Sequence, residues 1–252
     1  MSTFTFITGV SRGLGQGVAR ALSAQPLILT ARSRAAALAL SKELGPAHRA
    51  LALDVTKADQ VSALAKSLQG VQLSCVIHNA AIYERTASRE AAEGTMETNV
   101  LGPMRLHEAL LPFLTRDARL VLVSSGMGAL NGYSKAICQR LEHATRTAEV
   151  ERLTHEYLAA TASGSDSTTS ADAAHRAGFA RDPYSVSKAL INALALAWAH
   201  ELPGHIVVAV SPGWVQTDMG GPGAPGTLAQ GVARIVAATT AKVRSGAFLD
   251  DN

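Results

Sequence analysis

The chain has 252 residues, of which 47% are hydrophobic, so it can bury a sizeable core. Its formal net charge is only +3, with Lys and Arg scattered among acidic residues, which excludes a nucleic-acid-binding footprint and favours an anionic small molecule as ligand. Cys75 and Cys138 match neither metal-ligand spacing nor a disulfide framework, and no apolar run reaches about 18 residues. We therefore expect a cytoplasmic protein without a metal site, membrane span or export signal.

A strand, a glycine-rich turn and a helix open the chain. Residues 4–8 are a short β-like run, Gly9, Gly13 and Gly15 follow at once, and an apolar stripe of helical period begins at Val18. Glycines let the backbone approach a ligand, and the free N–H groups at the helix start favour phosphate oxygens. The same turn could serve packing alone, but its place between strand and helix favours a pyrophosphate site.

The second strand, at residues 26–30, ends beside Arg32. An NAD site would carry an acidic residue there for the ribose hydroxyls, whereas an arginine suits the 2′-phosphate of NADP(H). Arg12, inside the glycine turn, adds a second positive charge at the same corner. Each arginine alone is also typical of a solvated surface, and together they favour NADP(H).

Helices and strands then alternate regularly. We expect strands at residues 50–53, 73–77 and 119–123, separated by helices at 61–68 and 89–114. This alternation predicts an α/β fold: a Rossmann-type doubly wound parallel sheet with helices on both faces. In such sheets the ligand crevice lies outside the carboxyl ends of the strands.

Polar residues follow three of these strands and should face that crevice. Asp54 follows the third strand, Asn79 the fourth, and Ser124 and Ser125 the fifth. Asn99 falls within the predicted helix 89–114, where its side chain competes with helical hydrogen bonds. A functional role and a packing role fit that asparagine equally well.

The least regular region lies between residues 126 and 183. Residues 134–160 have a helical pattern that breaks near 146–147, and the small polar stretch 161–170 predicts a mobile loop. Because the sheet is still incomplete here, we interpret 126–183 as an insertion in a single domain spanning 1–252. Its histidines show no metal-ligand pattern.

Tyr184 and Lys188 lie four residues apart, so a helix running to about residue 200 places them on one face. We expect the ammonium to lower the pKa of the phenol from about 10 towards neutral pH, which would suit a general acid. The alternative is an ordinary exposed helical pair.

The sheet then finishes with a strand at 206–210, a helix at 228–238 and a closing strand at 246–249, which brings the total to about seven strands. The loop 212–227 between them is rich in Gly and Pro, as expected of a substrate flap.

These motifs together resemble the classical short-chain dehydrogenase/reductase family over nearly the whole chain. The shared residues, in the family's order, are Thr8-Gly9-x-x-x-Gly13-x-Gly15, Asp54, Asn79-Ala80, Asn99, Ser125, Tyr184-x-x-x-Lys188 and Pro212-Gly213. Thr30-Ala31-Arg32, the sequence Pro-Gly-Trp-Val-x-Thr-Asp-Met and the long interval before Tyr184 are similar to monomeric carbonyl reductases. His78 and Ala81 depart from the usual Asn-Asn-Ala-Gly motif as a variant rather than a loss.

The resemblance implies a catalytic tetrad of Asn99, Ser125, Tyr184 and Lys188. Tyr184 would exchange a proton with the substrate oxygen that Ser125 holds, while Lys188 would bond the nicotinamide ribose and Asn99 would anchor a water. Asp54 would contact the adenine ring. The residues expected to bind NADP(H) are Gly9, Ser11, Arg12, Gly13, Leu14, Gly15, Arg32, Asp54, Val55, Asn79, Ala80, Tyr184, Lys188, Pro212, Gly213, Val215 and Thr217.

The expected activity is NADP(H)-dependent reduction of a ketone, aldehyde or quinone-like carbonyl to an alcohol, or the reverse. A catalytically silent NADP-binding regulatory protein and a sepiapterin-like pterin reductase are the alternatives. The candidate pocket residues Tyr83, Met127, Trp214 and Met219 are apolar or aromatic, which favours an uncharged substrate over a sugar phosphate. Neither the physiological substrate nor the direction of reaction follows from the sequence.

Most relatives pair through the helices that bear Asn99 and Tyr184. We expect the insertion to cover those helices within the subunit, which favours a monomer over a dimer or tetramer. The covering positions would be Leu141, Leu153, Tyr157 and Leu158. In the other hypothesis the insertion is a lid over the substrate pocket and leaves the helices free to pair.

Overall fold

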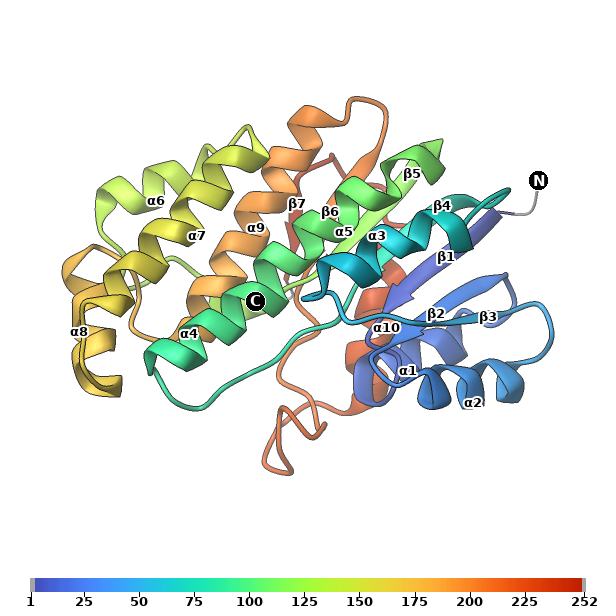
Figure 1. The fold of residues 1–252 in the computed structure, drawn as a ribbon, viewed down its shortest axis with the longest axis horizontal. Helices are drawn as coiled ribbons and strands as arrows, with labels where there is room; N and C mark the ends of the chain where they lie inside the picture. The colour runs from blue at the N-terminus through green and yellow to red at the C-terminus, as the bar shows by residue number, and fades with distance from the viewer. Residues whose placement is uncertain (1–2, 251–252) are drawn as a thin grey trace.

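The computed structural model describes residues 3–250, which contain one seven-stranded sheet with only parallel pairings (Figure 1). The strand order is β3-β2-β1-β4-β5-β6-β7. The strands are β1 (Thr3–Thr8), β2 (Leu27–Ala31), β3 (Arg49–Ala52), β4 (Gln72–His78), β5 (Leu114–Val123), β6 (Ile206–Val210) and β7 (Ala247–Leu249). The predicted fold class and number of strands are confirmed.

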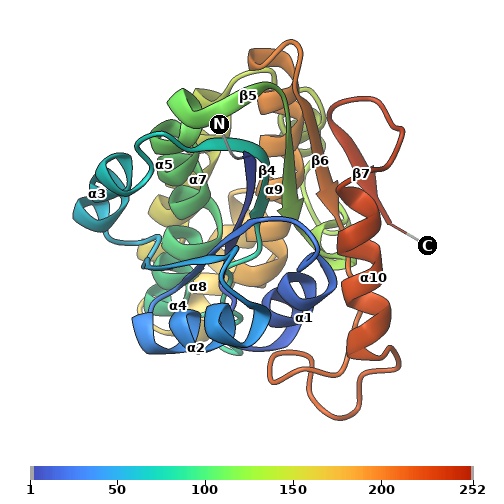
Figure 2. The same ribbon diagram turned by 90° about the vertical axis from the view of Figure 1, so that its right-hand side faces the viewer.

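Helices cover both faces of the sheet, as Figure 2 shows. One face carries α1 (Gly13–Ala21), α2 (Arg34–Leu44) and α10 (Leu228–Ala238), and the other carries α3 (Ala58–Ser67), α4 (Arg89–Met96), α5 (Gly102–Leu110) and α9 (Pro183–Glu201). The central strands are buried on both sides because each face packs against apolar stripes of these helices. This layering leaves the two ends of the strands as the places where a ligand can enter.

The strand order changes direction at β1, which lies between β2 and β4. Chain segments leaving the carboxyl ends of β1 and β4 therefore diverge to opposite faces and open a crevice between them. The glycine turn follows β1 and Asn79 follows β4, so both lie at this crevice.

The helix predicted at 89–114 is divided into segments of different winding. A π-helical turn, Glu97–Leu101, separates α4 from α5, and a 3-10 turn, Leu111–Phe113, follows α5. The predicted helix extends too far, because β5 begins at Leu114 rather than at Arg119. The polar residues at 115–117 interrupt the apolar pattern by which the start of that strand could have been predicted. Asn99 lies in the π turn, a type of local widening that often marks functional sites.

The insertion forms three helices, α6 (Lys135–Glu142), α7 (Thr147–Ala162) and α8 (Ser167–Arg176). The predicted break near 146–147 is confirmed, but the predicted mobile loop at 161–170 is wrong. α8 begins inside it because the Asp166 carboxylate accepts hydrogen bonds from the N–H groups of Thr168 (3.0 Å) and Thr169 (2.9 Å). The Thr169 hydroxyl in turn accepts one from the Asp166 N–H at 2.9 Å, which completes a capping box.

The insertion packs on the outer side of α4 and α9, with α7 lying beside both (Figure 1). Leu153 and Tyr157 of α7 are fully buried there, and Leu141 of α6 is 3% exposed. None of the residues 129–183 borders the two cavities described below. The insertion therefore packs on α4 and α9, and its three helices lie away from both cavities, whereas Gly126 and Met127 at its start border the second cavity.

Within residues 3–250, no helix combines the length and apolar character needed to cross a bilayer. The same described residues contain no cluster of His, Cys, Asp or Glu suited to a metal ion.

Candidate active site

The glycine turn after β1 brings backbone from three segments into close contact. Gly9 and Gly13 adopt left-handed conformations, with φ of 73° and 57°. A Cβ on Gly15 would lie 2.3 Å from the Gly9 carbonyl oxygen, so only glycine fits that position. Arg12, the N-cap residue of α1, provides no side-chain cap, which leaves the first N–H groups of the helix for an anion.

Thr8 and Asn79 tie the ends of β1 and β4 together beneath this turn. The Thr8 hydroxyl accepts hydrogen bonds from the N–H groups of Asn79 and Ala80, both at 2.9 Å. The Asn79 side-chain amide donates to the carbonyls of Thr8 (2.9 Å) and Gly9 (3.2 Å). These bonds hold the glycine turn at a fixed position against the sheet edge.

A cleft of about 680 Å³ opens above the glycine turn. That volume is within the range of cofactor and small-molecule sites. All the residues expected to bind NADP(H) border it except Gly213 and Val215, which border a neighbouring cavity. Several further residues that border the cleft were not predicted from the sequence, among them Thr56, Ile82, Thr98 and Asp218, while Met219, predicted for the substrate pocket, borders the cleft as well.

Two exposed arginines stand at the rim of the cleft, as expected for a 2′-phosphate site. Both Arg12 and Arg32 border it, and Arg12 forms a 3.0 Å ion pair with Asp218 of the flap. Burial alone would raise the pKa of Asp54, but hydrogen bonds from Thr56 and the nearby Arg32 hold it below its usual value. Asp54 is therefore a carboxylate at neutral pH.

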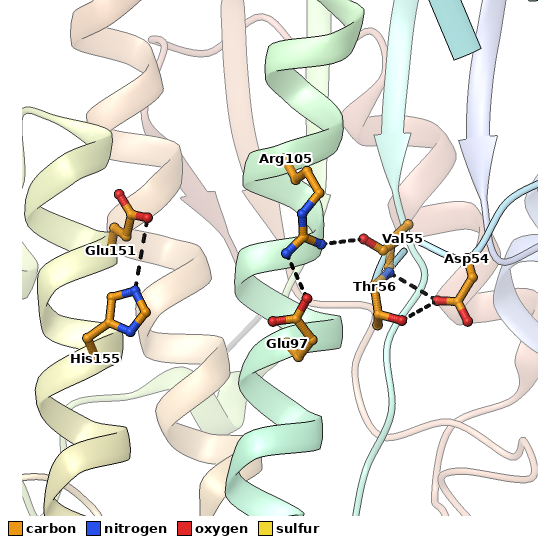
Figure 3. Close-up of polar contacts among 7 residues, drawn as sticks. All are labelled: Asp54, Val55, Thr56, Glu97, Arg105, Glu151 and His155. Carbon is orange, nitrogen blue, oxygen red and sulfur yellow. Dashed lines mark hydrogen bonds and ion pairs between the residues drawn. The ribbon is translucent and has the colours of Figure 1, made fainter. Parts of the chain in front are cut away.

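The loop after β3 is held in place from two sides, as Figure 3 shows. One oxygen of Asp54 accepts hydrogen bonds from the Thr56 N–H (3.0 Å) and hydroxyl (2.7 Å). Arg105 of α5 donates to the Val55 carbonyl at 2.8 Å and to Glu97 at 2.7 Å. The π turn and the cofactor-side loop are thus joined through one guanidinium.

Tyr184 is the second residue of α9 and borders both the cleft and the neighbouring cavity. Asp182 fixes the start of this helix by accepting a 2.7 Å hydrogen bond from the Ser185 N–H. Burial raises the pKa of Tyr184 to about 12 against the opposing effect of a hydrogen bond with Ser125, and the nearby Asp182 carboxylate adds to the rise. The expected lowering of this pKa is wrong for the structure as it stands.

The position of Lys188 explains that difference. Its ammonium is buried, donates to the Val123 carbonyl at 2.8 Å and lies 5.2 Å from the centre of the Tyr184 ring. The charge thus lies over the ring and is bonded to the sheet edge. Burial also lowers the pKa of Lys188 to about 7, so at neutral pH the charge is only partly present.

The two serines after β5 have different surroundings. Ser124 is buried, and its hydroxyl donates to the side-chain oxygen of Asn192 at 2.6 Å. Both serines border the neighbouring cavity, but the Ser125 hydroxyl accepts a 3.2 Å hydrogen bond from the Met127 N–H and is hydrogen-bonded to the Tyr184 phenol. Ser125 is therefore the serine whose hydroxyl lies beside the phenol, and its catalytic role stays a prediction.

Asn99 connects the π turn to two segments of the site. Its side chain accepts from the Ile82 N–H at 2.9 Å and donates to the Ile82 carbonyl and the Ser187 hydroxyl, both at 3.0 Å. Ser187 in turn donates to the Tyr184 carbonyl at 2.7 Å. The Asn99 side chain thus positions the loop after β4 and the first turn of α9.

A second cavity of about 820 Å³ lies beside the cleft and shares Tyr184 with it. The expected pocket residues Tyr83, Met127, Trp214 and Met219 all border it. So do three charged residues that the sequence reasoning missed, namely Arg85, Arg234 and Asp250. Arg85 follows a strand end, so the crevice rule could have indicated it.

A group of aromatic rings lies buried beneath the site. The His78 ring is 5.4 Å from Trp198, and the His107 ring stacks on the same indole at 4.0 Å. Burial lowers the pKa of His78 to about 3, with a contribution from His107, and lowers that of His107 to about 4. Both imidazoles are neutral in the folded protein at neutral pH.

The fold and the site together define a Rossmann-type protein with a glycine-lined cleft beside a Tyr, Lys and Ser group. The sequence model of the short chain dehydrogenase family matches residues 3–138. The chain belongs to the short-chain dehydrogenase/reductase family of oxidoreductases.

Its relatives include NADPH carbonyl reductases. Carbonyl reductase [NADPH] 1 of Sus scrofa is 32% identical over 241 residues, which cover 87% of this chain and 80% of the relative. The Oryctolagus cuniculus protein of the same name is 30% identical over 86% of this chain and 83% of its own length.

Solved structures show the same fold. Salutaridine reductase from Papaver somniferum superposes with a TM-score of 0.86 at 21% identity, over 99% of this chain and all of that one. A short-chain dehydrogenase/reductase from Burkholderia multivorans with bound NADP superposes with a TM-score of 0.72 at 25% identity, over 99% of this chain and 96% of that one.

Proposed function

We propose that this protein is an NADP(H)-dependent reductase of ketones, aldehydes or quinone-like carbonyls, and that it can run the reverse oxidation. The observation that carries the proposal is the hydrogen-bonded pair of Tyr184 and Ser125 at the wall between the two cavities. A carbonyl oxygen placed between these hydroxyls would lie next to the cofactor cleft. The names of the relatives support this substrate class.

The cleft fits NADPH, which when bound would supply a hydride. The glycine cradle, where a Cβ on Gly9 would lie 2.9 Å from the Ala80 backbone, leaves room for pyrophosphate against the start of α1. Arg12 and Arg32 at the rim would contact the 2′-phosphate. A relative named as NADPH-dependent and a related structure with bound NADP support this preference.

The residues of the chain would then bind, orient and protonate the substrate. Because its pKa is raised to about 12, Tyr184 holds a proton on its hydroxyl at neutral pH and can donate it to an oxygen that gains negative charge. Ser125 would hold that oxygen by a hydrogen bond. Lys188, which borders the cleft, would bond the nicotinamide ribose.

The rival proposals are a catalytically silent NADP-binding protein and a pterin reductase. We expect NADPH oxidation with a panel of ketones, aldehydes, quinones and sepiapterin to separate them, since a silent protein binds NADPH without turnover.

Tyr184→Phe tests the mechanism directly. We expect this variant to bind NADPH normally but to lose about a hundredfold or more in kcat, the usual effect of removing a general acid. The matched control is Tyr157→Phe, because that buried hydroxyl in α7 has no hydrogen-bond partner among the described residues and lies outside both cavities. Unchanged turnover in Tyr184→Phe would refute the assigned role.

The coverage of α4 and α9 by α7 supports a monomer, and the single sheet supports one NADP-binding domain spanning 1–252. Cys75 and Cys138 are free thiols, which fits a reducing compartment such as the cytoplasm.

A further inference from the structure

The cavity beside Tyr184 carries a positive charge that the proposed reaction does not use. Arg85, in the loop after β4, borders this cavity, and its guanidinium lies 5.8 Å from the centre of the Tyr83 ring. The Tyr83 ring is in turn 4.8 Å from the ring of Tyr184. Arg85 is thus one aromatic ring away from the proton donor.

Nothing in the described chain neutralises this guanidinium. Across residues 3–250, no carboxylate lies within ion-pair distance of Arg85, whereas neighbouring Arg89 pairs with Glu93 at 2.7 Å. Arg234 and Asp250 border the same cavity and are engaged in interactions of their own. Arg85 is thus a guanidinium at this cavity without an ion-pair partner among residues 3–250, and the ring of Tyr83 contacts it through a cation–π interaction.

The rest of the cavity mouth is apolar and open. Trp214 is 63% exposed, Met127 45% and Met219 37%, and all three border the cavity. Such side chains suit the hydrocarbon or aromatic body of a ligand, and a guanidinium suits a carboxylate at its end.

We propose that Arg85 determines specificity for carbonyl substrates that carry a carboxylate on an apolar body, with the carbonyl at Tyr184 and the carboxylate at Arg85. This inference rests on the proposed reductase function and departs from the uncharged substrate expected from the sequence. Because the Tyr83 ring lies between the guanidinium and Tyr184, we place the carboxylate at the end of the ligand remote from the carbonyl, as across an aromatic ring.

The test compares 4-acetylbenzoate with its methyl ester, in which a methyl group replaces the negative charge at the end opposite the ketone. We expect NADPH-dependent kcat/KM for the acid to exceed that for the ester by about tenfold or more, as a charge-assisted contact predicts. Arg85→Gln should remove this preference and leave ester turnover within about twofold. Arg89→Gln, which makes the same change in net charge away from the cavity, should keep the preference.

The inference is overturned by a preference for the ester, by a preference for the acid that survives Arg85→Gln, or by an equal loss on both probes in Arg85→Gln. Failure to reduce either probe while other ketones are reduced also overturns it, and the proposed function then stands. If NADPH binds but no carbonyl is reduced, the proposed function fails. In that case calorimetry measures the affinity of both probes for the NADPH complex. Tighter binding of the acid than of the ester supports the role of Arg85, and equal affinities contradict it.

Discussion

The buried histidines beside Trp198 should make the protein sensitive to mild acid. Burial lowers the pKa of His78 to about 3 and that of His107 to about 4, whereas imidazole in an unfolded chain has a pKa of about 6.5. Between these values the unfolded chain binds more protons than the folded one. The stability from neutral imidazoles is therefore fully present above about pH 6.5 and is lost as the pH falls towards the folded pKa values.

The size of the effect follows from the two pKa differences. For a fall from about pH 7 to about pH 5, each histidine lowers the free energy of unfolding by about 2 kcal/mol, or about 4 kcal/mol for the pair. The groups around the two imidazoles also disfavour their protonation. The Trp198 indole offers no negative charge, and His205 acts on His107 in the same direction as burial. A loss of that size is a large part of the 5–15 kcal/mol, roughly, that holds an ordinary domain folded.

Urea unfolding at the two pH values, followed by tryptophan fluorescence, measures this loss. His78→Phe keeps a ring against Trp198 without a titratable nitrogen, so we expect its loss between the two pH values to fall to about 2 kcal/mol. Any cost of the substitution that does not depend on pH cancels in this difference. His200→Asn, at the exposed end of α9, is the control and should behave like the parent. If His78→Phe lost as much stability as the parent, the account of the buried imidazole would be refuted.

Three further predictions concern the cofactor cleft and the assembly. Gly15→Ala should lower the free energy of unfolding by about 1–3 kcal/mol and weaken NADPH binding, because the new Cβ would lie 2.3 Å from the Gly9 carbonyl oxygen. Thermal unfolding measures the first effect and fluorescence titration with NADPH the second. Gly223→Ala is the control, since a Cβ there would have no atom within 4 Å. Arg32→Asp should reduce the preference for NADPH over NADH roughly 10- to 150-fold in kcat/KM, and an unmoved ratio would place the 2′-phosphate elsewhere. Light scattering at micromolar concentration should give a mass near 26.2 kDa, since α7 covers α4 and α9, and twice that mass would contradict a monomer.

The elements with strong periodicity were predicted well from the sequence. Strand 206–210 and helix 228–238 agree with β6 and α10 residue for residue, because each has a clear apolar pattern and distinct ends. Helix α8 was missed because its buried residues are small ones such as Ala171 and Ala174, which give little hydrophobic signal. Its start depends on the Asp166 cap, which a polar stretch hides.

The candidate site was predicted in position but not in electrostatics. The residues of the crevice could be predicted because all strands of a parallel sheet end at the same edge. This rule places Gly9, Asn79 and Ser125 close together, each after the end of a different strand. The pKa of Tyr184 could not be predicted, because helical spacing shows that Lys188 is near but not that its ammonium bonds to the Val123 carbonyl. The sequence likewise cannot show how deeply a phenol is buried.

The π turn at Glu97–Leu101 sets the rotational phase of the residues that follow it. A π turn holds one residue more than the α-helical turn it replaces, so α5 is rotated about the helix axis relative to α4. The two helices therefore have different packing partners: α4 lies against α7 and α9, and α5 lies against α3. Removing one residue from this turn would restore an unbroken α-helix and rotate α5 by about 100°. Arg105 would then leave both Glu97 and the Val55 carbonyl, and the loop after β3 would lose its support. The contacts of Arg105 therefore depend on the number of residues in this turn.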